Sequence, residues 1–195
     1  MPNAQHSIAT YVSDMLALEK HIRAPFLTQL DDGDFREYQD TTDVVTRLVA
    51  LTDGHIASLT SALERLDGHE AAPVKDAVGS VGGVVAGVID KVRKTKISKA
   101  LRDDYAALAF TIAGYVELLT SANAVDNLEV SALAQRHLED YAGLLVELAE
   151  CIPAVVIREL SELGLDVDPA VSLRTRQTVH QAWRSRTPER ANASS

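Results

Sequence analysis

The chain has 195 residues, of which 46% are hydrophobic and 5% aromatic, a composition that suits one well-buried domain and at most an appendage. The abundance of alanine, leucine, valine and glutamate favours an all-helical protein. The formal net charge of -9 excludes a broadly basic phosphate-binding surface, so we expect no nucleic-acid partner. A single cysteine, Cys151, excludes an internal disulfide, and no signal-peptide pattern is present, which together predict a cytoplasmic location.

The first third of the chain predicts two long helices. Apolar residues recur every three or four positions over residues 5–30 and again over 40–67, which is the spacing of one helical face. An acidic, glycine-containing turn at residues 31–34 separates them. Because this connection is short, we expect the two helices to form an antiparallel pair.

Residues 73–91 carry four glycines among valine and alanine, and they predict a short crossover helix that packs on the other helices. The apolar run within it, residues 78–89, is about a dozen residues long, whereas a helix needs roughly 20 to span a bilayer. We therefore expect no membrane partner.

The second half predicts helices over residues 98–122 and 126–150, and then a separate helix that starts at Pro153, because proline interrupts helices. The inward face expected for the first of them contains no carboxylate. Its members are Leu101, Tyr105, Leu108, Ile112, Tyr115 and Leu119.

These elements predict two parts, a helical bundle over residues 1–165 and a basic extension over 166–195. The extension contains several arginines and Trp183, and a helix there would carry a narrow apolar edge beside positive charge. Such an edge suits docking on an acidic bundle surface or on a protein partner.

Polar side chains interrupt three of the predicted apolar faces, at Glu19, His55 and His137. A buried carboxylate or imidazole is costly unless it is paired, hydrogen-bonded or bound to a metal. Asp140 lies three residues after His137, at the edge of the same face. Glu19, His55, His137 and Asp140 therefore predict a site for one divalent ion, with the nitrogen and oxygen donors that suit iron, zinc or manganese.

Short motifs in three helices resemble a bacterial ferritin-like family, formerly catalogued as a domain of unknown function and associated with stress responses. The motifs are Tyr11, Asp14, Leu18, Glu19 and Lys20, then Thr-Asp-Gly-His-Ile at 52–56, and Ile-Ala-Gly-Tyr at 112–115 after Asp104 and Ala-Ala-Leu at 106–108. The resemblance covers roughly residues 8–150. It implies an antiparallel four-helix bundle with an added crossover helix, a homodimer, and a metal pair placed as in rubrerythrins and ferritins.

Several carboxylates that such a metal pair needs are missing at the matching positions. Leu51 lies four residues before His55, the third long helix offers Leu108 or Thr111, and the fourth offers Arg136 and the adjacent histidine. Two divalent ions about 3.5 to 4 Å apart need negative charge between them. We therefore expect at most a mononuclear site, and no ferroxidase activity of the usual two-iron kind.

Two functions remain open at the level of the sequence. In the first, the bundle binds one divalent ion in its core. In the second, it is a metal-free, non-catalytic scaffold that acts through dimerisation or partner binding. In that case Glu19 accepts hydrogen bonds from a histidine of the same cluster or from Tyr105, Tyr115 or Tyr141.

Overall fold

The computed structural model describes residues 4–67 and 96–184, and every regular element in these two ranges is a helix. The elements are α1 (Ala4–Asp31), α2 (Gly33–Arg36), α3 (Gln39–Asp67), α5 (Ile97–Ala124), α6 (Leu128–Glu162) and α7 (Ala170–Arg184). The all-α prediction is confirmed for this part of the chain. The crossover helix predicted at 73–91 lies outside the described residues.

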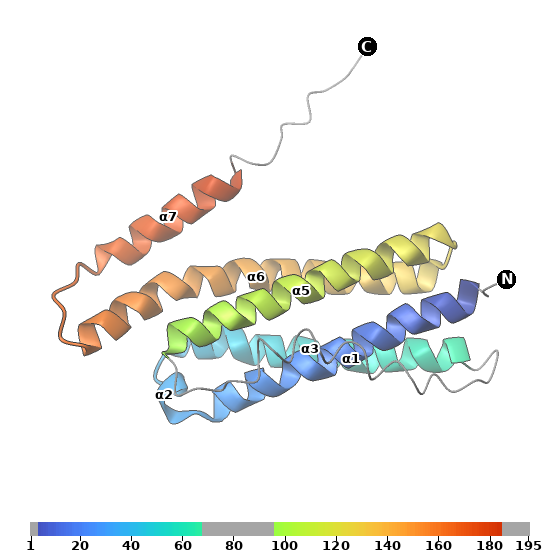
Figure 1. The fold of residues 1–195 in the computed structure, drawn as a ribbon, viewed down its shortest axis with the longest axis horizontal. Helices are drawn as coiled ribbons and strands as arrows, with labels where there is room; N and C mark the ends of the chain where they lie inside the picture. Colours follow the sequence, from blue (N-terminus) through green and yellow to red (C-terminus); the bar gives the residue numbers. More distant parts are fainter. Residues whose placement is uncertain (1–3, 68–95, 185–195) are drawn as a thin grey trace, which may run out of the picture.

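Four long helices lie side by side, with α1 and α6 running in one direction and α3 and α5 in the other (Figure 1). Helix α1 packs against α3 and α5, and α6 packs against the same two helices. Every long helix therefore has two long neighbours and presents one face to a shared interior. The expected antiparallel pairing of the first two helices is confirmed by α1 and α3.

The acidic segment between α1 and α3 forms one helical turn, α2, where the sequence predicted only a turn. The side chain of Asp32 accepts a hydrogen bond from the backbone N–H of Asp34 at 2.9 Å and caps this turn. Phe35 is buried against the core. The cap and this apolar anchor explain why the short segment becomes helical.

The predicted helix break at Pro153 is wrong, since α6 runs through it without interruption. Proline inside a helix costs about 3 kcal/mol through a lost hydrogen bond and a steric clash. Leu148 and Val155, seven residues apart, are both buried, so continuing the helix keeps one apolar face in the core on both sides of the proline. Burial of that face offsets the local cost.

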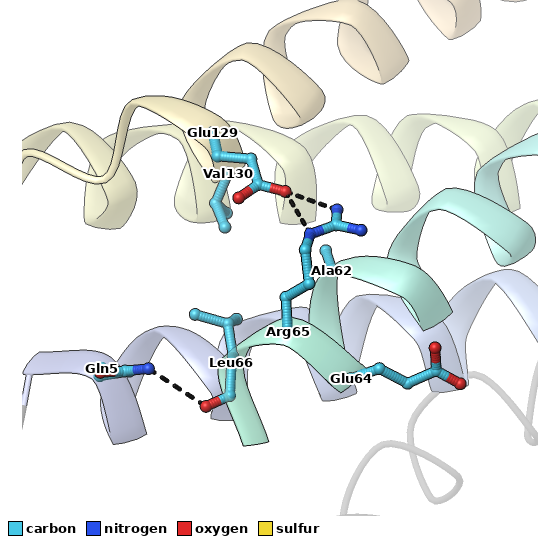
Figure 2. A pocket seen from close by; sticks show the side chains of 7 residues that line it. All are labelled: Gln5, Ala62, Glu64, Arg65, Leu66, Glu129 and Val130. Carbon is cyan, nitrogen blue, oxygen red and sulfur yellow. Dashed lines mark hydrogen bonds and ion pairs between the residues drawn. The ribbon is translucent and has the colours of Figure 1, made fainter. Parts of the chain in front are cut away.

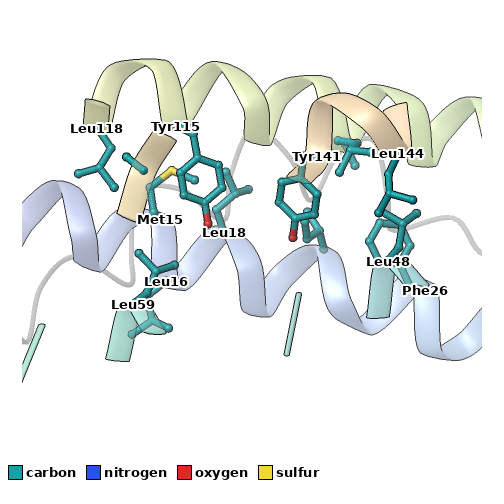
Figure 3. Packing of buried hydrophobic residues seen from close by; sticks show 14 of the residues in the cluster. Met15, Leu16, Leu18, Phe26, Leu48, Leu59, Tyr115, Leu118, Tyr141 and Leu144 are labelled. Atoms are coloured by element: carbon teal, nitrogen blue, oxygen red, sulfur yellow. The ribbon is translucent and has the colours of Figure 1, made fainter. Parts of the chain in front are cut away.

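The centre of the core contains the rings of Tyr115 from α5 and Tyr141 from α6, both fully buried. Figure 3 shows them among apolar side chains that include Leu18 and Leu48, with their hydroxyl oxygens directed away from α5. A buried tyrosine hydroxyl needs a hydrogen-bond partner. The orientation of these rings therefore marks a polar centre inside an otherwise apolar interior.

The buried face of α5 is rotated relative to the prediction. Tyr105, Ile112 and Leu119 are only partly buried, whereas Asp104 and Thr111 are buried. The expectation that this face lacks a carboxylate is therefore wrong. Because α5 packs against both α1 and α6, a wider arc of its surface is covered than one apolar stripe indicates.

The buried carboxyl group of Asp104 is only partly satisfied. Its Oδ1 accepts a hydrogen bond from Gln29 Nε2 at 2.7 Å, while its Oδ2 and the Gln29 Oε1 have no hydrogen-bond partner among the described residues. Burial raises the pKa of Asp104 to about 7, and the bond from Gln29 offsets part of this increase. The α1–α5 contact thus contains a carboxyl group that is disfavoured when ionised.

Asp104→Asn should remove a pH-dependent loss of stability. The folded-state pKa of Asp104 lies above its unfolded value, so its protonated form stabilises the fold at acidic pH, and this contribution disappears as pH rises through about 7. The free energy of unfolding, measured by urea at pH 5 and pH 8, should fall less with pH in Asp104→Asn than in the unchanged protein. Asp166→Asn, at an exposed position after α6, is the control. An unchanged pH slope in Asp104→Asn would contradict this explanation.

Helix α7 packs against α6, and none of its residues is buried. His180 contacts Glu150 of α6 at 2.5 Å, and both side chains are substantially exposed. Exposed pairs of this kind contribute little to stability. The interior formed by the four long helices therefore does not depend on α7.

Removal of residues 166–195 should leave one cooperative unfolding transition, because α7 buries no side chain. We expect the Tm to fall by no more than about 4 °C, which corresponds to roughly 1 kcal/mol for a domain of this size. Thermal unfolding followed by circular dichroism at 222 nm tests this expectation. A broad or non-cooperative melt of the shortened chain would show that the extension belongs to the folding unit.

One helix in the described residues, α5, is long and apolar enough to pass a simple test for a membrane span. A core helix of a helical bundle passes the same test. Two long helices, α1 and α6, pack against α5 in this structure. The finding therefore adds no independent indication of a membrane.

Candidate functional site

The carboxylate of Glu19 lies at the centre of a polar cluster to which all four long helices contribute. Glu19 comes from α1 and is 0% exposed. Its Oε1 accepts hydrogen bonds from the Tyr115 hydroxyl and from His55 Nδ1 at 3.1 Å. Its Oε2 accepts a hydrogen bond from the Tyr141 hydroxyl at 2.5 Å. Three donors from α3, α5 and α6 therefore converge on one buried acid.

The two tyrosines are held in the protonated form that donates to Glu19. Burial is the main cause that raises the pKa of both hydroxyls, and the charge of Glu19 raises it further. Tyr115 and Tyr141 are two of the three tyrosines that the sequence offered as donors. Tyr105 is only partly buried and does not join the cluster.

His137 joins the cluster through Tyr115 and Ser58 and is neutral. Its Nδ1 lies 3.0 Å from the Tyr115 hydroxyl and its Nε2 lies 2.9 Å from Ser58 Oγ. The Tyr115 hydrogen is used toward Glu19, so the Tyr115 oxygen accepts from Nδ1. Nε2 then carries the lone pair and faces the Ser58 hydroxyl, which also donates to the His55 carbonyl at 3.0 Å. Burial lowers the pKa of His137 to about 3, with smaller contributions from His55 and Arg136.

Two small polar residues of α3 complete the cluster, and neither was predicted from the sequence. Ser58 follows His55 by three residues and contacts His137, while Thr52 precedes His55 by three residues. Thr52 Oγ1 lies 2.9 Å from the Tyr141 hydroxyl and donates to the Leu48 carbonyl at 2.8 Å. Residues three positions apart in a helix lie on the same face, so Thr52 and Ser58 share the face of α3 that contains His55. Helical periodicity could therefore have predicted both.

Asp140, predicted as a fourth metal ligand, lies on the outer side of His55 and not beside Glu19. Its Oδ2 is 3.2 Å from His55 Nε2, and its side chain is 38% exposed. The other three predicted ligands meet in the core: Glu19, His55 and His137 each offer a ligand atom, all within 4.8 Å of one another. Three of the four predicted metal ligands therefore form a buried group, and the fourth, Asp140, lies at its edge.

The residues present do not fit a pair of metal ions. Leu108 is buried where another carboxylate would be needed, and the Thr111 hydroxyl donates to the carbonyl of its own helix at Ala107. Arg136 is exposed. One carboxylate and two imidazoles cannot neutralise two adjacent divalent ions.

The same residues could hold a single ion, after a change of side-chain geometry. Zinc bound tetrahedrally at about 2.1 Å separates its ligand atoms by roughly 3.4 Å, and the three ligand atoms here lie within 4.8 Å of one another. The rings of His55 and His137 are stacked, with centroids 3.7 Å apart and planes inclined by 13°. An ion in the plane of one ring lies outside the plane of the other, so one imidazole must turn to bind it.

Two pockets of the described residues lie outside the buried cluster. One of about 410 Å³ lies between α3 and α6, and Asp140 forms part of its wall. Another, of about 400 Å³, lies near the start of α1, where Arg65 pairs with Glu129 and Gln5 donates to the Leu66 carbonyl (Figure 2). The second pocket contains no histidine and shares no residue with the cluster.

Comparison of the chain with protein-family models, curated proteins and solved structures finds no match in any of the three. The interpretation of the cluster therefore rests on its own geometry and chemistry. Resemblance to the ferritin-like family remains an expectation from the motifs alone.

Tyr115→Phe should destabilise the protein by about 1 to 3 kcal/mol, because it removes a donor from Glu19 and leaves the His137 Nδ1–H without its acceptor in a buried site. Tyr105→Phe removes a hydroxyl from the same helix outside the cluster and should cost less than about 0.5 kcal/mol. Urea unfolding of both variants provides the comparison. Equal losses would show that the hydrogen bonds to Tyr115 do not support the fold.

Proposed function

We propose that this protein is a ferritin-like helical bundle that binds one divalent metal ion through Glu19, His55 and His137. The observation that carries the proposal is the convergence of three buried ligand atoms, from three helices, within 4.8 Å. Two imidazoles and one carboxylate form a donor set that suits zinc, iron or manganese. We assign no catalytic step to the ion, and a role in a stress response rests on the resemblance alone.

The residues of the cluster differ in which protons and hydrogen bonds they would lose on binding an ion. His137 is neutral, and its Nε2 already carries the lone pair that a metal needs. His55 loses the proton that its Nδ1 donates to Glu19, so the ion takes the place of that proton. Tyr141 can keep its bond to Glu19 Oε2 and hold the carboxylate in position.

A metal-free scaffold is the second candidate, and a specific observation favours it. Glu19 already accepts three hydrogen bonds, and no polar side-chain atom of the cluster is buried without a partner. A closed network of this kind stabilises a single core arrangement without any ion. In this case the protein acts through a homodimer, or through a protein partner at the extension that contains α7.

Elemental analysis of the purified, untagged protein separates the two candidates. Metal binding predicts about one ion per chain, and a melting temperature that falls on chelation and recovers on addition of zinc, iron or manganese. Glu19→Ala and His137→Ala should abolish both the bound ion and the response of the melting temperature. His180→Ala, which removes a histidine on α7 that contacts Glu150, should change neither.

The alternative predicts a different pattern in the same experiment. Without a site, added metal shifts the melting temperature of neither the unchanged protein nor Glu19→Ala. The variant then differs only by the loss of its hydrogen bonds. Two ions per chain would overturn both candidates, since the residues present do not fit a pair.

A further inference from the structure

We propose that the pocket between α3 and α6 is the route by which the ion reaches the core, with Asp140 as its first ligand. This inference rests on the proposed metal binding and adds an access path to it. The pocket has a volume of about 410 Å³, and its wall includes Asp140 and Gly143 from α6 and Leu51 from α3. Leu51 lies one helical turn before His55, so the pocket reaches the outer edge of the cluster.

His55 connects this pocket to the buried carboxylate. Its Nε2 lies 3.2 Å from Asp140 Oδ2 on the outer side, and its Nδ1 lies 3.1 Å from Glu19 Oε1 on the inner side. The imidazole is almost fully buried, whereas the side chain of Asp140 is 38% exposed. Asp140, His55 and Glu19 therefore form a continuous series of metal-binding groups from the surface to the core.

The charges around the pocket identify Asp140 as the carboxylate that can receive a cation. Glu147, the other carboxylate in the wall, forms a salt bridge with Arg47. Asp140 instead contacts an imidazole, which is itself a metal ligand. A divalent ion that enters the pocket thus meets one carboxylate already occupied by an arginine and one next to a histidine.

Small residues keep the pocket open. Gly143 lies in the middle of α6, where glycine is less favourable than alanine. A Cβ at this position would have no heavy atom within 4 Å, so no close helix contact requires the glycine. Ala50 lines the opposite wall on α3. A larger side chain at Gly143 or Ala50 would fill the pocket.

Transfer of the ion to the core requires an imidazole ring to turn, the same movement that metal binding itself requires. The stacked rings cannot share an ion until one imidazole turns. Rotation of the His55 side chain opens the path from the Asp140 side to Glu19, where His55 Nδ1 and His137 complete the ligand set. Asp140 is thus a positioning residue for uptake and is not part of the final site.

The test is the rate of Co²⁺ uptake by the full chain, followed by stopped-flow absorbance, together with the amount bound at equilibrium. Gly143→Leu fills the pocket and Asp140→Asn removes the receiving charge. Asp140→Asn should slow uptake by about tenfold or more, the lower end of the effect that placed charges have on association rates. Gly143→Leu should also slow uptake, because leucine fills the path. The equilibrium content of Gly143→Leu should stay at that of the unchanged protein.

Matched controls make the same changes outside the pocket. Gly54→Leu places leucine at an exposed glycine of α3 that also has no heavy atom within 4 Å of its Cβ position. Glu139→Gln removes a carboxylate next to Asp140 that bonds to Gln135. Both controls should take up Co²⁺ at the rate of the unchanged protein.

The outcomes separate this inference from the proposed function. If the unchanged protein takes up no Co²⁺ and no zinc, iron or manganese, metal binding itself is overturned. If it binds Co²⁺ and neither Gly143→Leu nor Asp140→Asn slows uptake, the route is overturned while the site stands. Ala50→Leu blocks the pocket from its other wall, so it decides the question if circular dichroism shows that Gly143→Leu does not fold.

Discussion

The structure depends on the burial of one acid, Glu19. A carboxylate removed from water is strongly disfavoured unless hydrogen bonds replace its hydration. Here His55, Tyr115 and Tyr141 supply those bonds, one from each of the other three long helices. The relative rotation of the helices is therefore restricted by polar contacts as well as by apolar packing. An apolar interior of leucine and alanine alone would specify that rotation less strictly.

Helical periodicity predicted most of the fold, and tertiary packing explains where it failed. The bounds of α1, α3 and α5 follow from apolar spacing and polar turns. The continuity of α6 through Pro153 could not be predicted locally, because burial on both sides of the proline outweighs its local cost. The burial of Asp104 depends on α5 having two neighbours, which no single helix pattern contains.

The candidate site was predictable in its residues but not in its geometry. Polar interruptions of apolar faces identified Glu19, His55 and His137, and the structure brings them together. The stacking of the two imidazoles and the outward place of Asp140 depend on side-chain torsions. Neither is encoded in spacing along a helix. The same side-chain atoms can therefore form either the hydrogen-bond network or the metal site. The two states differ in the orientation of one imidazole ring and in the Nδ1 proton of His55.

Helix α6 is the longest of the four long helices. This helix has 35 residues, while α3 has 29 and α5 has 28. His137 lies 25 positions before the end of α6 at Glu162, a distance of about 37 Å along the axis. Helix α7 follows that distant end and contacts α6 without burying a residue. Helix α7 then turns back along α6, so that His180 contacts Glu150, which lies 13 positions after His137, or about 20 Å along the axis. A partner that displaces α7 would therefore act on the middle of α6 as well as on its end.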